Sequence, residues 1–297
     1  MRHTHQPVGS PRSCGPSKVF PIGLGGMLLS IEGRPDRAQA IATIHAALDA
    51  GVALIDSASA YHVGADEVGH NETLIAEALA GWHGDTDQIT VVTKAGRVRP
   101  GDGRWLTDSS PDHVIRTAEA SRKRLGRARI DLFFLHAPDP TVPLVRSLEA
   151  LRFLVREGVA ATVGVSNVTV AELDLARDTL GDALVAVQNE FSPSATQHAA
   201  VLRRAEELGL AFLAWRPLGT IGKHADDLTA AFTGVGRAHG VSPQQVALAW
   251  LMATSPAVIP IPGARRAATI RDSAAAAALE LAPETLRDLD RLTGWAA

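Results

Sequence analysis

The sequence alternates eight times between a short apolar run and a longer segment of helical periodicity. The runs between Val19 and Ile261 are mostly continuous stretches of Val, Ile, Leu, Ala and Phe, as expected of parallel strands that helices cover on both faces. Between the runs, apolar residues recur every three or four positions, as Ile41 and Ile44 do, and glycines such as Gly51 follow the helical segments. Eight such units with no linker predict an α/β fold, a closed (β/α)8 TIM barrel; a doubly wound open sheet is the alternative.

The bounds of the expected elements follow from these periods and from helix start signals. Ser110–Pro111–Asp112, Asn71 and the Ser242–Gln245 capping-box pattern are such starts. Strands are expected at 19–26, 52–56, 89–94, 130–136, 161–166, 184–188, 211–215 and 257–261; helices at 37–50, 71–81, 110–125, 144–157, 170–177, 198–208, 246–253 and 267–278; and extra helices near the C-terminus at 226–238 and 283–293.

Composition excludes several classes of protein. With 46% hydrophobic and 21% charged residues the chain is typical of a soluble globular protein, and 297 residues can bury a sizeable core. A formal net charge of −3 gives no reason to expect nucleic acid or an anionic membrane as a partner. No apolar stretch reaches the ~18–20 residues of a membrane span. We therefore expect a cytoplasmic protein that acts on a small molecule as a monomer or weak oligomer.

The first 18 residues differ in composition from the rest. They are rich in His, Pro, Ser, Gly and Arg and lack the apolar core of a secretory signal, so we expect a flexible leader over 1–18 and one domain over 19–297. The single cysteine, Cys14, excludes an intramolecular disulfide and fits a reducing compartment.

Three expected strands end in side chains that can take part in proton transfer. Asp56 ends the second strand, Lys94 the third and His136 the fourth, and Tyr61, the only tyrosine of the chain, follows Asp56 by five residues. Alone, the aspartate could be a turn cap, the lysine a solvated charge and the histidine a core imidazole. Since the carboxyl ends of barrel strands converge on one mouth, their joint placement predicts that all four meet there.

Together these four groups could deliver a proton to an oxygen. A phenol with a pKa of ~10 is too weak an acid near neutrality, and a neighbouring ammonium would lower that pKa. Asp56 would hold Lys94, and His136 could donate to a carbonyl oxygen. The set supplies no electrons, so a hydride donor must bind beside it.

Two other kinds of site receive no support. His62, His70 and His83 make no metal-ligand spacing with a cysteine or carboxylate pair, so no metal is expected. The G-x-G-x-x-G fingerprint is also absent, because Gly23-x-Gly25-Gly26 is too short.

The donor's site is expected in the loops after the last two strands. Segments 216–220 and 262–266 combine glycines with arginine, which suits a pyrophosphate and an additional phosphate. Ser166, Asn167 and Gln188 could hydrogen-bond a carboxamide at the mouth, and Trp215 could stack on a planar ring.

At these residues the chain resembles the aldo-keto reductase superfamily, from about Pro21 to the C-terminus. The motifs that carry the resemblance are Asp56-x4-Tyr61, Thr93-Lys94, Leu135-His136, Gly164-Val165-Ser166-Asn167, Gln188-x-Glu190-Phe191-x-Pro193, Pro217-Leu218-Gly219 and Ile261-Pro262-Gly263-Ala264-Arg265.

The resemblance implies a single barrel domain and NAD(P)H-dependent reduction of an aldehyde or ketone, usually with NADPH, with NADH possible. It makes Tyr61 the general acid, Lys94 and Asp56 the residues that adjust the pKa of Tyr61, and His136 the group that orients the carbonyl. The implied cofactor-binding residues are Gly26, Met27, Asp56, Ser166, Asn167, Gln188, Trp215, Arg216, Pro217, Leu218, Gly219, Ile261, Gly263, Ala264, Arg265, Thr269, Asp272 and Ser273. The expected substrate-pocket residues are Met27, Tyr61, Trp105, His136, Ala137 and Phe191.

The chain departs from the family where the 2′-phosphate or adenine would bind. Related chains often carry Lys, Arg and Asn where Gly263, Thr269 and Ser273 stand, which leaves the preference between NADP and NAD open; our hypothesis is that Arg265 and Arg266 contact the phosphate instead. The alternatives to a reductase are a nucleotide-binding regulatory or low-turnover subunit, and a barrel lyase that forms a Schiff base on Lys94.

Overall fold

Eight parallel strands form the centre of the molecule. In a computed structural model that describes residues 9–224 and 226–295, each strand pairs with its neighbours in chain order, and ring-closing bonds join the first strand to the last: Gly23 N donates to Pro260 O at 2.9 Å and Gly25 N to Pro262 O at 3.0 Å. The sheet is therefore the predicted barrel and not a doubly wound sheet. Its strands are β3 (Leu24–Gly25), β4 (Leu54–Asp56), β5 (Thr90–Ala95), β8 (Ile130–Leu135), β9 (Ala160–Ser166), β10 (Leu184–Glu190), β11 (Ala211–Trp215) and β12 (Val258–Pro260).

Glycines make the closure possible. A Cβ on Gly23 would stand 2.7 Å from Cδ2 of Leu54, and one on Gly25 would stand 2.7 Å from the carbonyl oxygen of Ile261. The Leu54 methyl group could move aside, but the backbone oxygen of Ile261 could not, so Gly25 is the position where glycine lets β3 approach the last strand closely.

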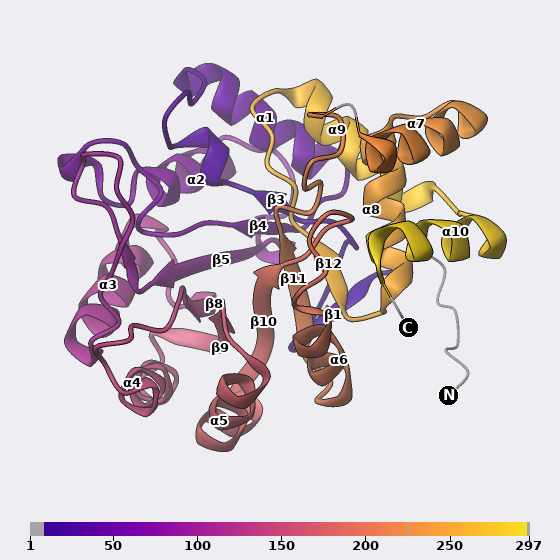
Figure 1. Ribbon diagram of the computed structural model, residues 1–297. Helices are drawn as coiled ribbons and strands as arrows, with labels where there is room; N and C mark the ends of the chain where they lie inside the picture. The colour runs from indigo at the N-terminus through magenta and orange to yellow at the C-terminus, as the bar shows by residue number, and fades with distance from the viewer. Residues whose placement is uncertain (1–8, 225, 296–297) are drawn as a thin grey trace.

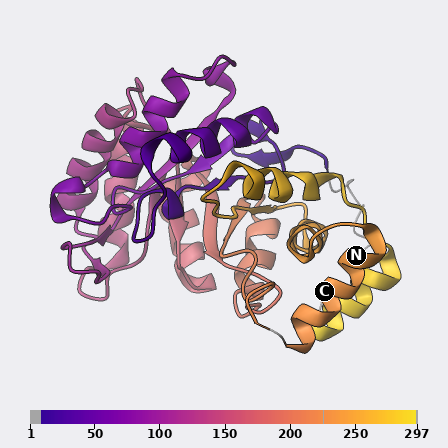
Figure 2. The same cartoon turned by 90° about the horizontal axis from the view of Figure 1, so that it is seen from above.

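Helices surround the sheet (Figure 1), and two of them are extra to the barrel. In Figure 2 the extra pair, α7 (Asp227–His239) and α10 (Pro283–Thr293), lies side by side at one edge, as predicted near the C-terminus. The barrel helices are α1 (Arg37–Asp49), α2 (His70–Ala80), α3 (Pro111–Arg124), α4 (Leu144–Arg156), α5 (Val170–Leu180), α6 (Ala199–Glu207), α8 (Pro243–Thr254) and α9 (Ala267–Ala275).

One predicted helix start is wrong. Gly69, with φ of 84°, is the N-cap of α2, and Asn71 lies inside the first turn with its side chain completely buried. Its amide nitrogen donates to Gly26 O at 2.9 Å and to Ser30 Oγ at 2.8 Å. The residue type suits a cap, but tertiary hydrogen bonds to the loop after β3 determine its position.

The predicted flexible leader is also wrong over its second half, while residues 1–8 lie outside the described residues. β1 (Arg12–Cys14) and β2 (Ser17–Val19) pair as an antiparallel hairpin. Cys14 and Val19 are buried against interior barrel residues that include Leu54 and Val185, near the amino-terminal ends of their strands. The hairpin therefore covers the end of the barrel opposite to the mouth, and burial raises the pKa of the Cys14 thiol to about 12.

A second hairpin rises from the mouth itself. Directly after β5, β6 (Arg97–Val98) pairs antiparallel with β7 (Leu106–Thr107).

In the part of the chain that the structure describes, no helix is both long and apolar enough to cross a membrane.

Candidate active site

A buried ion pair lies at the carboxyl ends of β4 and β5. Lys94 Nζ donates to Asp56 Oδ2 at 2.7 Å and to Ser57 O at 2.7 Å, and the two charged side chains are 0% and 4% exposed. The same ammonium donates to Tyr61 Oη at 3.3 Å. Because the phenolic oxygen accepts this bond, its own proton is left for another acceptor.

The loop after β4 carries the phenol to the ammonium. Ser57 N donates to Val92 O at 2.8 Å and Ser59 N to Lys94 O at 3.2 Å, so the chain follows β5 past the end of β4. A turn in which Tyr61 N donates to Ala58 O then reverses it. The backbone of two neighbouring strands thus sets the distance between Tyr61 and Lys94.

The electrostatics of Tyr61 correct one prediction from the sequence. We expected Lys94 to lower the pKa of the phenol, but burial, and then the negative charge of Asp56, raises the pKa of Tyr61 well above its usual value. Asp56 neutralises the ammonium at close range, so the positive charge cannot outweigh desolvation. The phenol therefore keeps its proton at neutral pH.

His136 lies next to the phenol. Its backbone N donates to Ala95 O at 2.8 Å, and its half-buried ring meets the Tyr61 ring edge to face, with centroids 5.8 Å apart. Burial, then the positive charges of Lys94 and Arg97, lower the pKa of His136 well below its usual value. A neutral imidazole that can donate one N–H is the result.

A chain of hydrogen bonds extends from Asp56 along the next strand ends. Gln188 Nε2 donates to Asp56 Oδ1 at 2.8 Å, and Ser166 Oγ donates to Gln188 O at 2.7 Å. Asn167 Nδ2 donates to His136 O at 2.8 Å, while its Oδ1 accepts from Trp215 Nε1 at 3.2 Å. The predicted carboxamide and ring-stacking residues are therefore held in one network with the predicted catalytic residues.

The loops after β11 and β12 carry three exposed arginines. Arg216 has a φ of 49°, unusual for a bulky residue, and pairs with Glu190 at 3.2 Å. Arg265 and Arg266 are exposed immediately before α9, and Arg266 is its N-cap without a side-chain cap bond. Uncapped first-turn N–H groups beside two guanidinium groups suit a phosphate, so the residues present fit a dinucleotide.

The other predicted cofactor residues lie around these loops, and two of them have different neighbours. Both carboxylate oxygens of Asp272 accept bonds at the start of α8, from Ser242 Oγ at 2.8 Å and Gln245 Nε2 at 2.6 Å, and Ser273 is buried. Thr269 is exposed on α9; Gly26, Pro217, Gly219, Ile261 and Ala264 are buried; and Met27, Leu218 and Gly263 are half-buried.

The predicted pocket walls divide into two groups. Trp105, 38% exposed, meets the Tyr61 ring edge to face at 6.4 Å, and Ala137 directly follows His136. Phe191 does not belong to the pocket: it is completely buried and packs against Trp250 and the C-terminal Trp295. Its prediction is wrong because the chain turns after β10 and directs this ring outward, into the layer between barrel and helices.

Sequence reasoning missed a buried carboxylate behind the lysine. Glu72 is 0% exposed on α2; it accepts from Thr93 Oγ1 at 2.5 Å and from Arg124 Nε at 2.6 Å. Glu72 lies three residues before Ile75 on the face of α2 that packs inward. A polar residue continuing an apolar helical stripe is the signal that could have revealed it.

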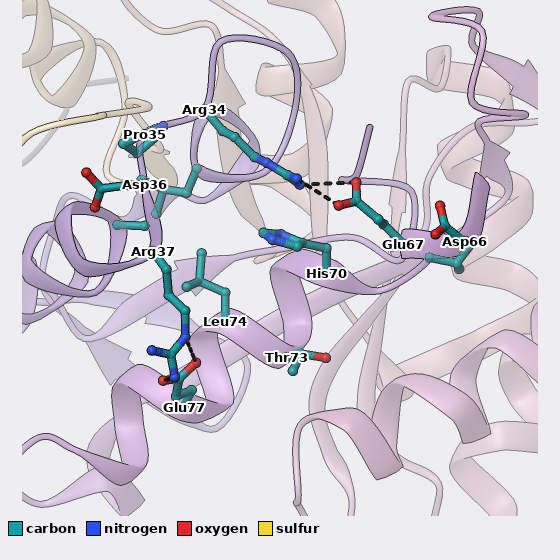
Figure 3. Close-up of a pocket in the computed structure, with 13 residues that line it drawn as sticks. Arg34, Pro35, Asp36, Arg37, Asp66, Glu67, His70, Thr73, Leu74 and Glu77 are labelled. Carbon is teal, nitrogen blue, oxygen red and sulfur yellow. Dashed lines mark hydrogen bonds and ion pairs between the residues drawn. The ribbon is translucent and has the colours of Figure 1, made fainter. Parts of the chain in front are cut away.

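A separate cleft of about 640 Å³ lies outside the mouth, between the starts of α1 and α2 (Figure 3). Two arginines reach across it to glutamates: Arg34 to Glu67 and Arg37 to Glu77. These charges satisfy one another, so the cleft has no evident ligand.

Among the residues that the structure describes, no cluster of His, Cys, Asp or Glu could hold a metal ion.

The barrel mouth brings a buried phenol, a buried ammonium and an imidazole together next to a candidate dinucleotide site, and comparison with known proteins specifies the class of protein. The model of the Aldo/keto reductase family matches residues 21–293. The chain is 34% identical to a 6-dehydroglucose reductase of Novosphingobium aromaticivorans, over 87% of this chain and 86% of that protein. It is 31% identical to the pyridoxine 4-dehydrogenase of Escherichia coli, over 94% and 96% respectively.

Solved structures agree with the sequence relatives. The glycerol dehydrogenase AKR11B4 of Gluconobacter oxydans superimposes with a TM-score of 0.82 at 25% identity, covering 97% of this chain and 95% of that one. An aldo/keto reductase of Klebsiella pneumoniae, solved with NADP and acetate, gives 0.79 at 27% identity, covering 96% and 95%. The chain belongs to the aldo/keto reductase family and is an NAD(P)H-dependent oxidoreductase.

Proposed function

We propose that this protein reduces an aldehyde or ketone to an alcohol and that Tyr61 donates the proton. The observation that carries the proposal is the position of Lys94 Nζ, which contacts Asp56, Ser57 O and the Tyr61 oxygen in one buried cluster at the barrel mouth. Lone carboxylates and lysines at strand ends are common, but a buried neutral phenol whose oxygen accepts from a buried ammonium is arranged to give its proton to an oxygen that gains negative charge.

Each residue has one part in the proposed reaction. The neutral His136 donates a hydrogen bond to the carbonyl oxygen and orients it toward the phenol. The reduced nicotinamide cofactor supplies the hydride when it is bound. Tyr61 gives its proton to the oxygen as that oxygen gains negative charge, and the ammonium of Lys94 at 3.3 Å stabilises the phenolate that forms.

The proposed cofactor site extends from this cluster to α9. Ser166, Asn167 and Gln188 would hold the carboxamide, Trp215 would stack on the ring, and the loops that contain Arg216 and Arg265 would hold the phosphates. A guanidinium matches a phosphate in geometry as well as charge, so the exposed Arg265 and Arg266 favour the phosphorylated dinucleotide.

Cofactor preference can be tested at Arg265. We expect Arg265→Ala to lower the preference for NADPH over NADH by about 10-fold, mainly through KM for NADPH, since one charge-assisted phosphate contact is lost. Arg287, on α10 and away from these loops, gives a matched control, and Arg287→Ala should leave the ratio unchanged. An unchanged ratio in Arg265→Ala would count against the phosphate contact.

The two alternative functions predict different behaviour of Lys94 and of the bound nucleotide. For a Schiff-base lyase, the lysine nitrogen must be free to attack a carbonyl, yet Nζ of Lys94 is fully buried and bonded to Asp56 and Ser57 O. A low-turnover regulatory subunit would bind the nucleotide without consuming it.

The proposal is tested by following NADPH absorbance with 4-nitrobenzaldehyde in the parent protein and in Tyr61→Phe. We expect turnover in the parent and a loss of at least ~100-fold in the variant, with cofactor affinity retained, because only the proton donor is removed. NADPH binding without turnover in the parent would support the regulatory subunit. Borohydride trapping of a carbonyl on Lys94 would support the lyase.

A further inference from the structure

Arg97 holds a position that the proposed reaction leaves unexplained. It begins β6, two residues after Ala95, and the carbonyl of Ala95 accepts the backbone N–H of His136 at 2.8 Å. Its register partner across the hairpin is Thr107. The residue therefore lies at the carboxyl end of β5, directly beside the mouth.

The side of the hairpin on which Arg97 lies can be identified from its neighbour. Arg99, two residues on, contacts Trp105 with its guanidinium 4.8 Å from the ring and donates to His62 O. Trp105 in turn meets Tyr61 edge to face. Since residues two apart in an extended chain share a face, Arg97 lies on the face of the hairpin that looks toward the phenol.

The charge of Arg97 reaches the site from this position. Together with Lys94, its positive charge lowers the pKa of His136, which agrees with a guanidinium close to the imidazole. The side chain is half-buried, so solvent screens the charge only in part.

Arg97 also carries a positive charge at the mouth to which the proposed function assigns no role. Lys94 pairs with Asp56, Arg99 with Glu32, and Arg216 with Glu190. Within residues 9–224 and 226–295, Arg97 has neither an ion pair nor a side-chain hydrogen bond. The acidic residues of its own hairpin are engaged elsewhere, Asp102 with Arg104 and Asp108 with Ser110 and His113.

We propose that Arg97 binds a carboxylate carried by the carbonyl substrate. The proposal rests on the proposed reductase function, since it identifies the class of carbonyl compound that this mouth accepts. A guanidinium binds a carboxylate through two parallel N–H donors and so fixes its orientation as well as its charge. With the carboxylate on Arg97, the reacting carbonyl of the same molecule lies beside His136 and Tyr61, and Trp105 offers a flat apolar wall. An aromatic aldehyde acid carries both of these groups on one flat apolar ring.

The test compares 4-carboxybenzaldehyde with its neutral methyl ester, methyl 4-formylbenzoate. We expect the parent protein to prefer the acid, and Arg97→Gln to lower the acid-to-ester ratio of kcat/KM by about 10-fold or more, mostly through KM for the acid. Arg104→Gln changes an exposed arginine on the same hairpin, and we expect it to keep the parent ratio. Added salt should weaken the preference of the parent for the acid.

Two results would overturn the carboxylate site. The first is an acid-to-ester ratio that is the same in the parent and in Arg97→Gln. The second is equal affinity of these two proteins for 4-(hydroxymethyl)benzoate, the alcohol product, measured by tryptophan fluorescence without any turnover. Failure of the parent to reduce even the ester would contradict the proposed function itself, and the fluorescence titration would still decide whether Arg97 captures the anion.

Discussion

The ion pair at the barrel mouth and the ion pairs of the outer cleft use the same chemical groups in different surroundings. Lys94 and Asp56 are 0% and 4% exposed, whereas Arg34 and Glu67 are each 29% exposed and Arg37 is 72% exposed. The cleft pairs (Figure 3) are open enough for water to replace a lost partner. At the mouth it cannot, so each charge depends on its protein partner.

This difference in exposure determines how strongly each ion pair affects the ionisation of its neighbours. A buried pair is costly to desolvate and is weak evidence for stability, but its surroundings shift the pKa values of nearby groups. Burial and Asp56 raise the pKa of Tyr61, and Lys94 contributes to the low pKa of His136. The cleft pairs instead join the loop after β3 and the start of α1 to the region around α2.

Removing the buried ammonium should have the largest effect on stability. Lys94→Met leaves the Asp56 carboxylate buried without its cation, which we expect to destabilise the fold by about 3–5 kcal/mol and to abolish most turnover. Urea unfolding measures the change. The double variant with Asp56→Asn should recover part of the loss, because it removes the orphaned charge. A loss below about 1 kcal/mol would mean that water reaches the pair.

The outer pair at Glu67 should have a smaller effect that depends on pH. Arg34 and the backbone N–H of Gly64 hold the pKa of Glu67 at about 2, below its unfolded value. The stability it contributes is therefore fully present above the unfolded pKa of ~4.3 and is lost as the pH falls toward the folded value. With screening allowed for, we expect about 1 kcal/mol, measured as a weaker acid destabilisation of Glu67→Gln than of the parent.

Glu77 provides the control for that variant. Its pair with Arg37 lies in the same cleft but is more exposed, so Glu77→Gln should change the free energy of unfolding by no more than about 0.5 kcal/mol. An equal effect of the two variants would show that the hydrogen bonds of Glu67 to the backbone N–H groups of Val63 and Gly64, just after Tyr61, add no measurable stability.

Much of the fold could be predicted because one pattern repeats eight times. Continuous apolar runs indicate buried parallel strands, and in a closed barrel the strands that are adjacent in the chain pair in order. The hairpin at Arg12–Val19 could not be predicted in this way, because residues distant in sequence bury it. Val185 belongs to the cluster that buries Cys14 and Val19, and the buried Arg12 donates to Met252 O at 2.8 Å. Asn71 was misassigned for the same reason, since its partners Gly26 and Ser30 are distant in sequence.

The site was predictable where a strand ends and unpredictable where a loop turns. Asp56, Lys94 and His136 follow apolar runs, and their convergence is a property of the barrel. Phe191 follows β10 by one residue yet faces Trp250, because the turn after the strand determines its direction. The pKa of Tyr61 could not be predicted from proximity to Lys94, since it depends on burial that only the three-dimensional structure defines.

Titration of the lone phenol tests the central claim most directly, because Tyr61 is the only tyrosine and its ionisation appears alone in the near-ultraviolet spectrum. With Tyr61→Phe as the baseline, we expect no tyrosinate in the free protein until the pH exceeds the ordinary phenol value of ~10. Tyrosinate formed between pH ~7 and ~9 would instead show that Lys94 dominates, and would contradict a proton donor kept neutral by burial and Asp56.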